Sequence, residues 1–275
     1  MIIEPLNKYE QSLTKRFKSD IWRKFVRGIN KYNMLKEGDK VAVCISGGKD
    51  SMLMALCFKQ LHRFSKFPFD VEYIVMDPGY KKENRELIIQ NAETLGLNIH
   101  IFNSPIFDAV ENAGGSPCYL CARMRRGYLY EYAKSLGCNK IALGHHFDDA
   151  VETILLSMFY GSEYKTMMPK LKSSSHKGME LIRPMYLIEE KDIINWKNYN
   201  NLTFLQCACK MTIANEQNSK ELESKRKEIK NLLASLKKIN PNISKNIFSS
   251  IHKVNLATVI GYIKDGKEIS FLDEY

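Results

Sequence analysis

Short apolar segments alternate with amphipathic segments along most of this chain, and this alternation constrains the fold more than any other feature. Length and β-branched content predict strands at 41–45, 71–76, 98–102, 140–143 and 180–185. Helical spacing of apolar residues predicts helices at 52–61, 84–95, 119–136, 148–159 and 188–199. Strands that alternate with helices in this way form parallel βαβ units. We therefore expect an α/β fold with a doubly wound, mostly parallel sheet.

Both ends of the chain are predicted to be helical and basic. Residues 1–40 carry 10 basic and 5 acidic side chains, and residues 217–275 carry 11 and 7. The central residues 41–216 are nearly neutral, with 20 and 19. We expect a helical N-terminal segment, a central α/β domain and a basic helical tail with these boundaries, and a polar loop at 161–178. The two flanks are either solvated lysine-rich faces or surfaces that hold a polyanion such as nucleic acid.

The sequence predicts a cytoplasmic protein. No run approaches the roughly 18 apolar residues of a membrane span. The stretch from Met1 to Glu10 lacks the arrangement of a signal peptide. In a reducing cytoplasm, the seven cysteines favour metal or redox chemistry over disulfides.

A glycine-rich loop follows the first predicted strand and opens its helix. Its residues are Ser46, Gly47, Gly48, Lys49, Asp50 and Ser51. Ligands of open α/β sheets bind outside the carboxyl ends of the strands, where this loop lies. The glycines allow close backbone approach to an anion, the helix start supplies N–H groups, and the serines and lysine add donors. Asp50 can hold magnesium between phosphates. The alternative is a glycine-rich turn capped by Asp50 or Ser51.

Polar residues after other strands are expected at the same edge. Gly144 permits approach to a nucleotide, and Asp148 is the preferred second magnesium residue beside Asp50. Asp149 is as well explained by helix capping as by function. Asp77 either reaches the adenosine or the metal, or belongs only to a turn with the following proline and glycine. For the two histidines after Gly144, nucleotide or structural contacts are favoured over zinc ligation.

Two groups of cysteines are candidates for metal or redox chemistry. Cys118 and Cys121 have C-x-x-C spacing near a predicted helix start, and Cys207 and Cys209 follow about 90 residues later. Zinc could use these four thiols or a histidine. A redox pair would need only the first two, an iron–sulfur cluster would use thiolates of both groups, and packed structural thiols are the plain alternative.

The remaining cysteines and a group of arginines have separate interpretations. Cys44 and Cys57 are placed in the core, and Cys138 is an incidental loop residue. Cys44 is also included among the expected ATP contacts. The helix after the C-x-x-C carries three arginines, which either are solvated or contact phosphate or RNA; they are Arg123, Arg125 and Arg126.

The sequence resembles known families at these motifs. Residues 46–51 resemble the SGGxDS pyrophosphate loop of the N-type ATP pyrophosphatases, the adenine-nucleotide alpha-hydrolase superfamily. Residues 118–127 resemble the C-x-L-C-x-R-x-R-R-G segment of tRNA 2-thiocytidine synthetases. Further matches follow in the same order at 142–149, 158–161, 168–171 and 182–184, so that the resemblance spans roughly residues 20–215.

The resemblance implies ATP-dependent tRNA thiolation. ATP is cleaved between its α and β phosphates, AMP is joined to the C2 oxygen of an anticodon-loop cytidine, and sulfur then replaces AMP. It also implies Mg²⁺ and a [4Fe-4S] cluster on Cys118, Cys121 and either Cys207 or Cys209. Cys207 matches better by its preceding residues, although the family has C-x-x-C where this chain has C-x-C.

The resemblance further implies tRNA, a sulfur donor such as a cysteine desulfurase, and a second copy of the chain as partners. The expected ATP contacts are Cys44, Ser46, Gly47, Gly48, Lys49, Asp50, Ser51, Asp77, Gly144 and Asp148. Alternatives are a zinc- or persulfide-dependent tRNA thiouridylase, lysidine synthesis, and a non-catalytic RNA-binding iron–sulfur module.

Overall fold

The computed structural model describes residues 6–104, 117–205 and 218–273, and the side chains among them except those of residues 117–123 and 218–224. The chain forms two compact units. The first comprises Met1–Ala150 and Met168–Arg226, and the second comprises Val151–Met167 and Lys227–Tyr275. The N-terminal segment therefore belongs to the same unit as the central domain, and residues 151–167 group with the tail.

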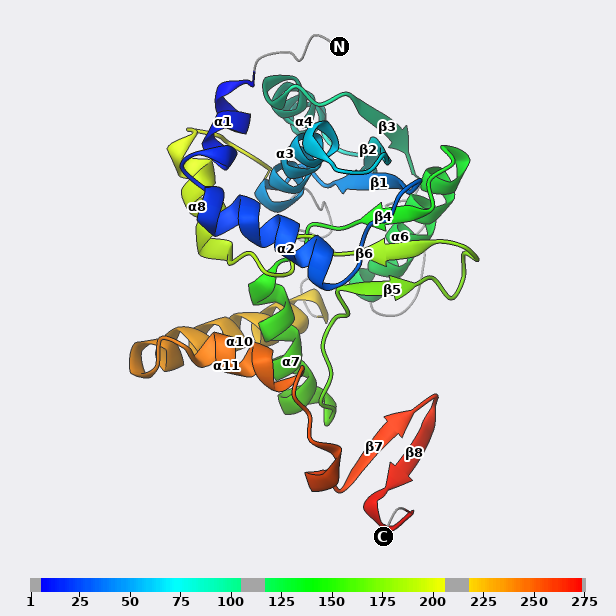
Figure 1. Ribbon diagram of the computed structural model, residues 1–275, viewed down its shortest axis with the longest axis vertical. Helices are drawn as coiled ribbons and strands as arrows, with labels where there is room; N and C mark the ends of the chain where they lie inside the picture. The colour runs from blue at the N-terminus through cyan, green and yellow to red at the C-terminus, as the bar shows by residue number, and fades with distance from the viewer. Residues whose placement is uncertain (1–5, 105–116, 206–217, 274–275) are drawn as a thin grey trace. The chain divides into compact units, whose positions relative to one another are not determined.

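A six-stranded sheet forms the centre of the first unit (Figure 1). Its strands are β1 (Lys40–Ile45), β2 (Asp70–Asp77), β3 (Ile99–Asn103), β4 (Lys140–Ala142), β5 (Lys170–Lys172) and β6 (Glu180–Ile182). The strand order is β3-β2-β1-β4-β6-β5, and every pair is parallel except β5 with β6. The predicted mostly parallel α/β sheet is confirmed. The order reverses between β1 and β4, which is the switch point where such sheets bind ligands.

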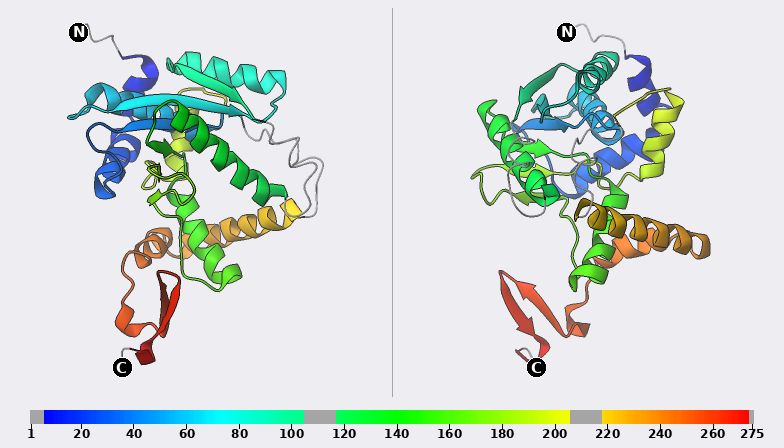
Figure 2. Two further views of the ribbon diagram at one scale, coloured as in Figure 1. Left: turned by 90° about the vertical axis from the view of Figure 1, so that its right-hand side faces the viewer. Right: turned by 180° about the vertical axis from the view of Figure 1, so that it is seen from behind.

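Alternate residues of β1 are buried on opposite faces of the sheet. Val41, Val43 and Ile45 belong to one apolar core, and Ala42 and Cys44 belong to the other. The first core also takes residues of α3 (Lys49–Phe64), α4 (Lys82–Leu95) and α8 (Glu190–Tyr199), whereas α6 (Pro117–Ser135) contributes to the second. Figure 2 shows α4 and α6 on opposite sides of the sheet. Because both faces are covered, β1 is apolar from residue 41 to residue 45.

Amphipathic helices at the N-terminus complete the first core, as predicted. They are α1 (Lys8–Thr14), a π-helical turn (Lys18–Trp22) and α2 (Arg23–Lys31). Ile21, Phe25 and Ile29 are buried. The indole Nε1 of Trp196 in α8 donates to Ser12 Oγ at 3.1 Å, and this bond fixes α8 to the N-terminal helices.

The second unit contains helices and a terminal hairpin. Its helical parts come from α7 (Phe147–Gly161), α10 (Asn218–Ile239) and α11 (Ile243–Ser250). Within it, Tyr160 Oη donates to Glu228 Oε2 at 2.7 Å. Strands β7 (Gly261–Lys264) and β8 (Lys267–Ser270) pair antiparallel. No helix among the described residues is both long and apolar enough to cross a membrane.

Three local features differ from the sequence-based expectations. The predicted loop at 161–178 contains β5, a three-residue edge strand with a lysine at each end and therefore too short and polar for an apolar pattern to show. The expected helical tail ends in the β7–β8 hairpin, whose Asp265-Gly266 turn has positive φ at both residues, 53° and 76°, as a type I′ turn requires. Cys138 is a buried core residue rather than an incidental one.

Candidate functional site

A cavity of about 570 Å³ lies in the first unit at the carboxyl ends of β1 and β4. It joins the glycine loop to side chains from α6 and from the residues that follow β2, β4 and β6. The lining residues are Cys44, Ile45, Ser46, Asp50, Ser51, Met76, Tyr80, Arg125, Arg126, Leu129, Leu143, Gly144, His145, Asp149 and Arg183. The predicted glycine loop thus lines a cavity at the predicted edge of the sheet.

Internal hydrogen bonds hold the glycine loop in shape. Gly47 has a φ of +84°, and a Cβ there would lie 2.7 Å from Ile88, so that only glycine fits. The Ser46 backbone N–H donates to Ser51 Oγ at 3.1 Å, and the Ser51 hydroxyl donates to the Gly48 carbonyl at 3.0 Å. Ser51, expected as a ligand donor, therefore stabilises the loop. The loop leads directly into the start of α3, whose N–H groups and positive dipole end suit an anion.

Two acidic side chains surround the lysine of the loop. Lys49 Nζ lies 3.2 Å from Asp50 Oδ2 and 3.1 Å from Glu190 Oε1. Burial disfavours its charge, but the two carboxylates outweigh burial and raise the pKa of Lys49. Glu190 was not identified from the sequence, because this residue begins α8 and is more than 100 residues away from the loop in the chain.

Asp50 presents an oxygen that is available to a cation. Its Oδ1 is buried and has no hydrogen-bond partner among the described residues. The neighbouring His146 Nε2 lies 3.9 Å away. A carboxylate oxygen without a partner, at the wall of a cavity that suits phosphates, fits the oxygen ligation that Mg²⁺ prefers.

The two aspartates at the start of α7 have different contacts. Asp148 Oδ2 accepts a hydrogen bond of 2.7 Å from the backbone N–H of Glu190, the first residue of α8. Asp148, expected to bind magnesium, thus caps a helix and is not among the residues that line the cavity. Asp149 lines the cavity, and its Oδ2 accepts from the His146 N–H at 2.9 Å.

Asp77 and Gly144 shape the edge of the site. Asp77 Oδ1 accepts hydrogen bonds from the backbone N–H groups of Gly79 and Tyr80 at 2.9 and 2.7 Å. These bonds form the turn that the sequence analysis gave as the alternative to a contact with adenosine or metal. Tyr80, which this turn positions, lines the cavity. A Cβ on Gly144 would lie 3.1 Å from the backbone nitrogen of Ser51, so this glycine allows the chain after β4 to pack against the start of α3.

Arginines from two elements meet at the cavity. Arg125 and Arg126 of α6 line it, and the buried Arg125 Nε has no hydrogen-bond partner among the described residues. Arg183, directly after β6, is 7% exposed and donates through Nε to His145 Nδ1 at 3.3 Å and through Nη1 to the Met168 carbonyl. Arg183 lies within the strand predicted at 180–185, and its place in the matched motif at 182–184 was the signal that could have identified it. The side chain of Arg123 lies outside the described residues.

Burial changes the ionisation of His145 and Arg183. The pKa of His145 is lowered to about 4, first by burial and then by the charge of Arg183. The pKa of Arg183 is lowered to about 10 by burial, and the charge of Arg126 adds to the effect. At neutral pH, His145 is therefore a neutral acceptor and Arg183 a desolvated cation. A polyphosphate is a suitable counterion for it.

Residues 17–219 match the PP-loop domain family. The tRNA-cytidine(32) 2-sulfurtransferase of Polaromonas naphthalenivorans is 34% identical over 272 residues, which cover 97% of this chain and 80% of that protein. The enzyme of the same name from Alcanivorax borkumensis is 37% identical over 234 residues, which cover 83% and 78%. The chain belongs to the PP-loop family of tRNA-cytidine(32) 2-sulfurtransferases. The family resemblance found in the sequence is thereby confirmed.

A solved structure supports the PP-loop fold. The U34-tRNA thiolase NcsA from Methanococcus maripaludis, determined with its [4Fe-4S] cluster, matches with a TM-score of 0.66. The match covers 88% of this chain and 80% of that chain at 21% sequence identity. After the family, we call the glycine loop Ser46–Ser51 the PP-loop.

The structure describes only part of the segments that carry the expected cluster cysteines. The backbone of Cys118 and Cys121 is in α6, but their side chains are not described, and Cys207 and Cys209 lie outside the described residues. The N–H of Leu205 donates to the Gly47 carbonyl at 3.1 Å, so the chain enters the segment of Cys207 at the PP-loop. Among the residues described with side chains, no group of three or more histidines, cysteines or acids could hold a metal ion.

The other three cysteines are buried and free. Cys44 lines the cavity, as its inclusion among the ATP contacts requires. Burial raises the pKa of the Cys44 and Cys57 thiols, and it raises that of Cys138 to about 11. All three are therefore neutral thiols at physiological pH, which are poor nucleophiles and poor metal ligands.

Proposed function

We propose that this chain catalyses the ATP-dependent 2-thiolation of a cytidine in the anticodon loop of tRNA. The observation that carries the proposal is the cavity beside the PP-loop. It combines a loop suited to phosphates, three arginines and an Asp50 oxygen without a partner. The names of the relatives supply the substrate class, tRNA cytidine.

The first step joins AMP to the base. The C2 oxygen of the cytidine attacks the α phosphorus of ATP, and pyrophosphate leaves. Negative charge builds on the departing phosphates, and Arg125, Arg126 and Arg183 are placed to offset it. Asp50 would hold Mg²⁺, which neutralises phosphate charge when bound. Asp148 is not assigned as a direct ligand of Mg²⁺, because its carboxylate caps α8.

The second step replaces AMP by sulfur. Sulfide, to which a thiol reductant would convert persulfide sulfur from the donor, attacks C2, the bond between C2 and the oxygen breaks, and AMP leaves with that oxygen. We assign Cys118, Cys121 and Cys207 as ligands of a [4Fe-4S] cluster, which when bound supplies an iron site that can hold sulfur for transfer. Positions 118 and 121 are three residues apart in α6 and so share one side of that helix. Cys207 is chosen over Cys209 because the residues that precede it match the family better.

The basic flanks are proposed to hold the tRNA. In the N-terminal part, a groove of about 730 Å³ is lined by Lys18, Arg23, Arg27 and Lys31 around Trp22, and no acidic residue is among its lining residues. Such a surface suits a phosphate backbone. We further propose a cysteine desulfurase as sulfur donor, a homodimer and a cytoplasmic location.

Nucleoside analysis of tRNA from cells with and without the gene tests the function directly. Loss of 2-thiocytidine alone is expected, and an unchanged nucleoside profile would refute the proposal. The purified protein should form AMP and pyrophosphate from ATP only with tRNA present. Anaerobic preparations should contain iron and sulfide, and a colourless protein with one zinc would contradict the cluster. Activity retained in Cys118→Ala would favour lysidine-type chemistry, which needs no thiol.

A further inference from the structure

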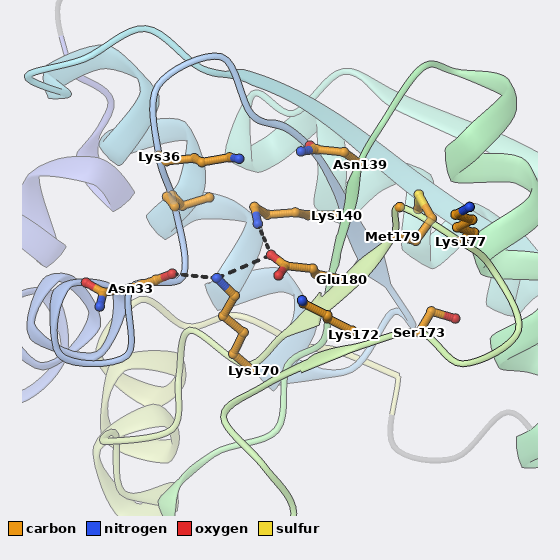
Figure 3. A pocket seen from close by; sticks show the side chains of 12 residues that line it. Asn33, Lys36, Asn139, Lys140, Lys170, Lys172, Ser173, Lys177, Met179 and Glu180 are labelled. Atoms are coloured by element: carbon orange, nitrogen blue, oxygen red, sulfur yellow. Dashed lines mark hydrogen bonds and ion pairs between the residues drawn. The ribbon is translucent and has the colours of Figure 1, made fainter.

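A second cationic cavity lies at the opposite edge of the sheet from the PP-loop. Its volume is about 720 Å³, and five lysines line it (Figure 3). We call it the lysine pocket; its lysines are Lys36, Lys140, Lys170, Lys172 and Lys177. Lys140 and Glu180 begin β4 and β6, and the antiparallel β5 ends here at Lys172. The lysine pocket shares no lining residue with the cavity beside the PP-loop.

Two of these lysines are fixed by buried or half-buried acids. Lys140 pairs with Glu180 and lies 3.5 Å from the fully buried Asp39. Lys170 Nζ lies 3.3 Å from Glu180 and donates to the Asn33 carbonyl at 2.9 Å. Burial would raise the pKa of Glu180, but the two lysines outweigh burial and lower it. These ion pairs hold Lys140 and Lys170 in place at the base of the lysine pocket, which we call its floor.

The other three lysines are available to a ligand. Lys36, Lys172 and Lys177 are exposed, and no ion pair joins them to an acid among the described residues. Five lysines against Glu180 and Asp39 leave an excess of three positive charges, which favours an anionic ligand. Lysine ammonium groups are flexible point charges, which suit phosphates more than the planar, two-point recognition for which arginine is used.

The edge strand β5 connects the lysine pocket to the catalytic edge. At one end of β5, the carbonyl of Pro169 accepts from the backbone N–H of Arg183, a residue of the PP-loop cavity. At the other end, Lys172 pairs in register with Glu180. A three-residue strand is about 10 Å long, roughly the rise of three nucleotides in a duplex strand. A polynucleotide with one base at the PP-loop cavity can therefore reach the lysine pocket.

We propose that the lysine pocket binds the phosphodiester backbone of the tRNA, a few nucleotides away from the base that is modified. This inference rests on the proposed function, because it takes tRNA as the substrate. Lys36, Lys172 and Lys177 contact phosphates, while Lys140 and Lys170 hold the floor of the pocket. The contacts add affinity and direct the strand along β5, but they take no part in ATP chemistry.

The test removes the three available charges together. The triple variant Lys36→Ala, Lys172→Ala, Lys177→Ala is compared with Lys66→Ala, Lys82→Ala, Lys134→Ala, which removes three exposed lysines that line none of the cavities described above. Binding of an unmodified tRNA transcript is measured between low and high salt. Removal of one phosphate-binding lysine should weaken binding roughly fourfold to sixfold at about 0.15 M salt, which is on the order of 100-fold for three, and the salt slope should fall by about 2 to 3 in the triple variant.

The outcomes separate this inference from the proposed function. The control variant should keep most of its tRNA affinity, and both variants should bind ATP and melt as the unmodified protein does. An equal decrease of affinity in both triple variants would overturn the inference, because it would show a dependence on net charge alone. Full affinity in the lysine-pocket variant would also overturn it. If the unmodified protein itself neither binds tRNA nor forms AMP with it, the proposed function has failed instead.

Discussion

Replacing Arg183 with methionine should weaken ATP use without destabilising the fold. Arg183 is 7% exposed, and burial lowers its pKa from 12.5 to about 10. A change of that size corresponds to about 3 kcal/mol by which the site disfavours the charged guanidinium. Its hydrogen bonds to His145 and Met168 return about 1 kcal/mol each. Methionine has a similar length, so we expect the free energy of unfolding to stay the same or rise by about 1 kcal/mol.

The cost of the substitution should appear in ligand binding. A hydrogen bond from a charged donor to phosphate is worth about 1.5 to 3 kcal/mol. Removal of that bond in Arg183→Met should therefore weaken ATP binding or tRNA-dependent AMP formation by roughly 10- to 150-fold. Arg183→Lys is the matched control, since it keeps the charge and lacks the planar donor set. The ATP affinity and AMP formation of Arg183→Lys should lie between those of the unmodified protein and those of Arg183→Met.

Urea unfolding and ATP titration on the same preparations test this reasoning. If the free energy of unfolding of Arg183→Met falls by more than about 3 kcal/mol, the main role of the guanidinium is to stabilise the fold and not to bind an anion. Unchanged ATP affinity in Arg183→Met, with stability preserved, would refute the assignment of Arg183 to the phosphates.

Three further predictions concern the same cavity. Gly144→Ala should lose about 1 to 3 kcal/mol of stability and bind ATP more weakly, because its Cβ would lie 3.1 to 3.3 Å from the backbone at the start of α3; a variant as stable as the unmodified protein would contradict this packing. The pKa of His145 is about 4 in the folded chain against an ordinary 6.5, so the unfolded chain takes up the proton first and stability should fall by up to about 3 kcal/mol from pH 6.5 to 4. Urea unfolding across this range should show a shallower fall in His145→Gln, and an identical fall would place the titration elsewhere. Asp50→Asn should raise the Mg²⁺ concentration needed for half-maximal AMP formation at least about tenfold, because its free Oδ1 loses its charge. Asp148→Asn, the control, should cost about 1 kcal/mol of α8 capping with little change in the Mg²⁺ requirement, and equal Mg²⁺ shifts would show that both aspartates bind the metal.

Much of the fold could be predicted because its signals are local. The apolar run of β1 and the glycine loop after it lie within a dozen residues, and the structure places both as expected. The short strand β5 could not be predicted, since pairing with β6 defines it and its own residues show no apolar pattern. The Asp265-Gly266 turn is a local hairpin signal that the prediction of a helical tail missed.

The sequence by itself determined the PP-loop, because backbone conformation and side-chain donors within Ser46–Ser51 depend on neighbouring residues. Only the tertiary structure decided which distant charges meet there. It brought Arg183 and Arg125 to one cavity, and it made Asp148 a cap of α8 while Asp149 lines that cavity. The physical reason is that these roles depend on how helices and strands pack across the sheet. Residues 148 and 149 are adjacent in the chain, yet Asp148 bonds to the start of α8, 42 residues later, whereas Asp149 lines a cavity together with Arg125 and Arg183.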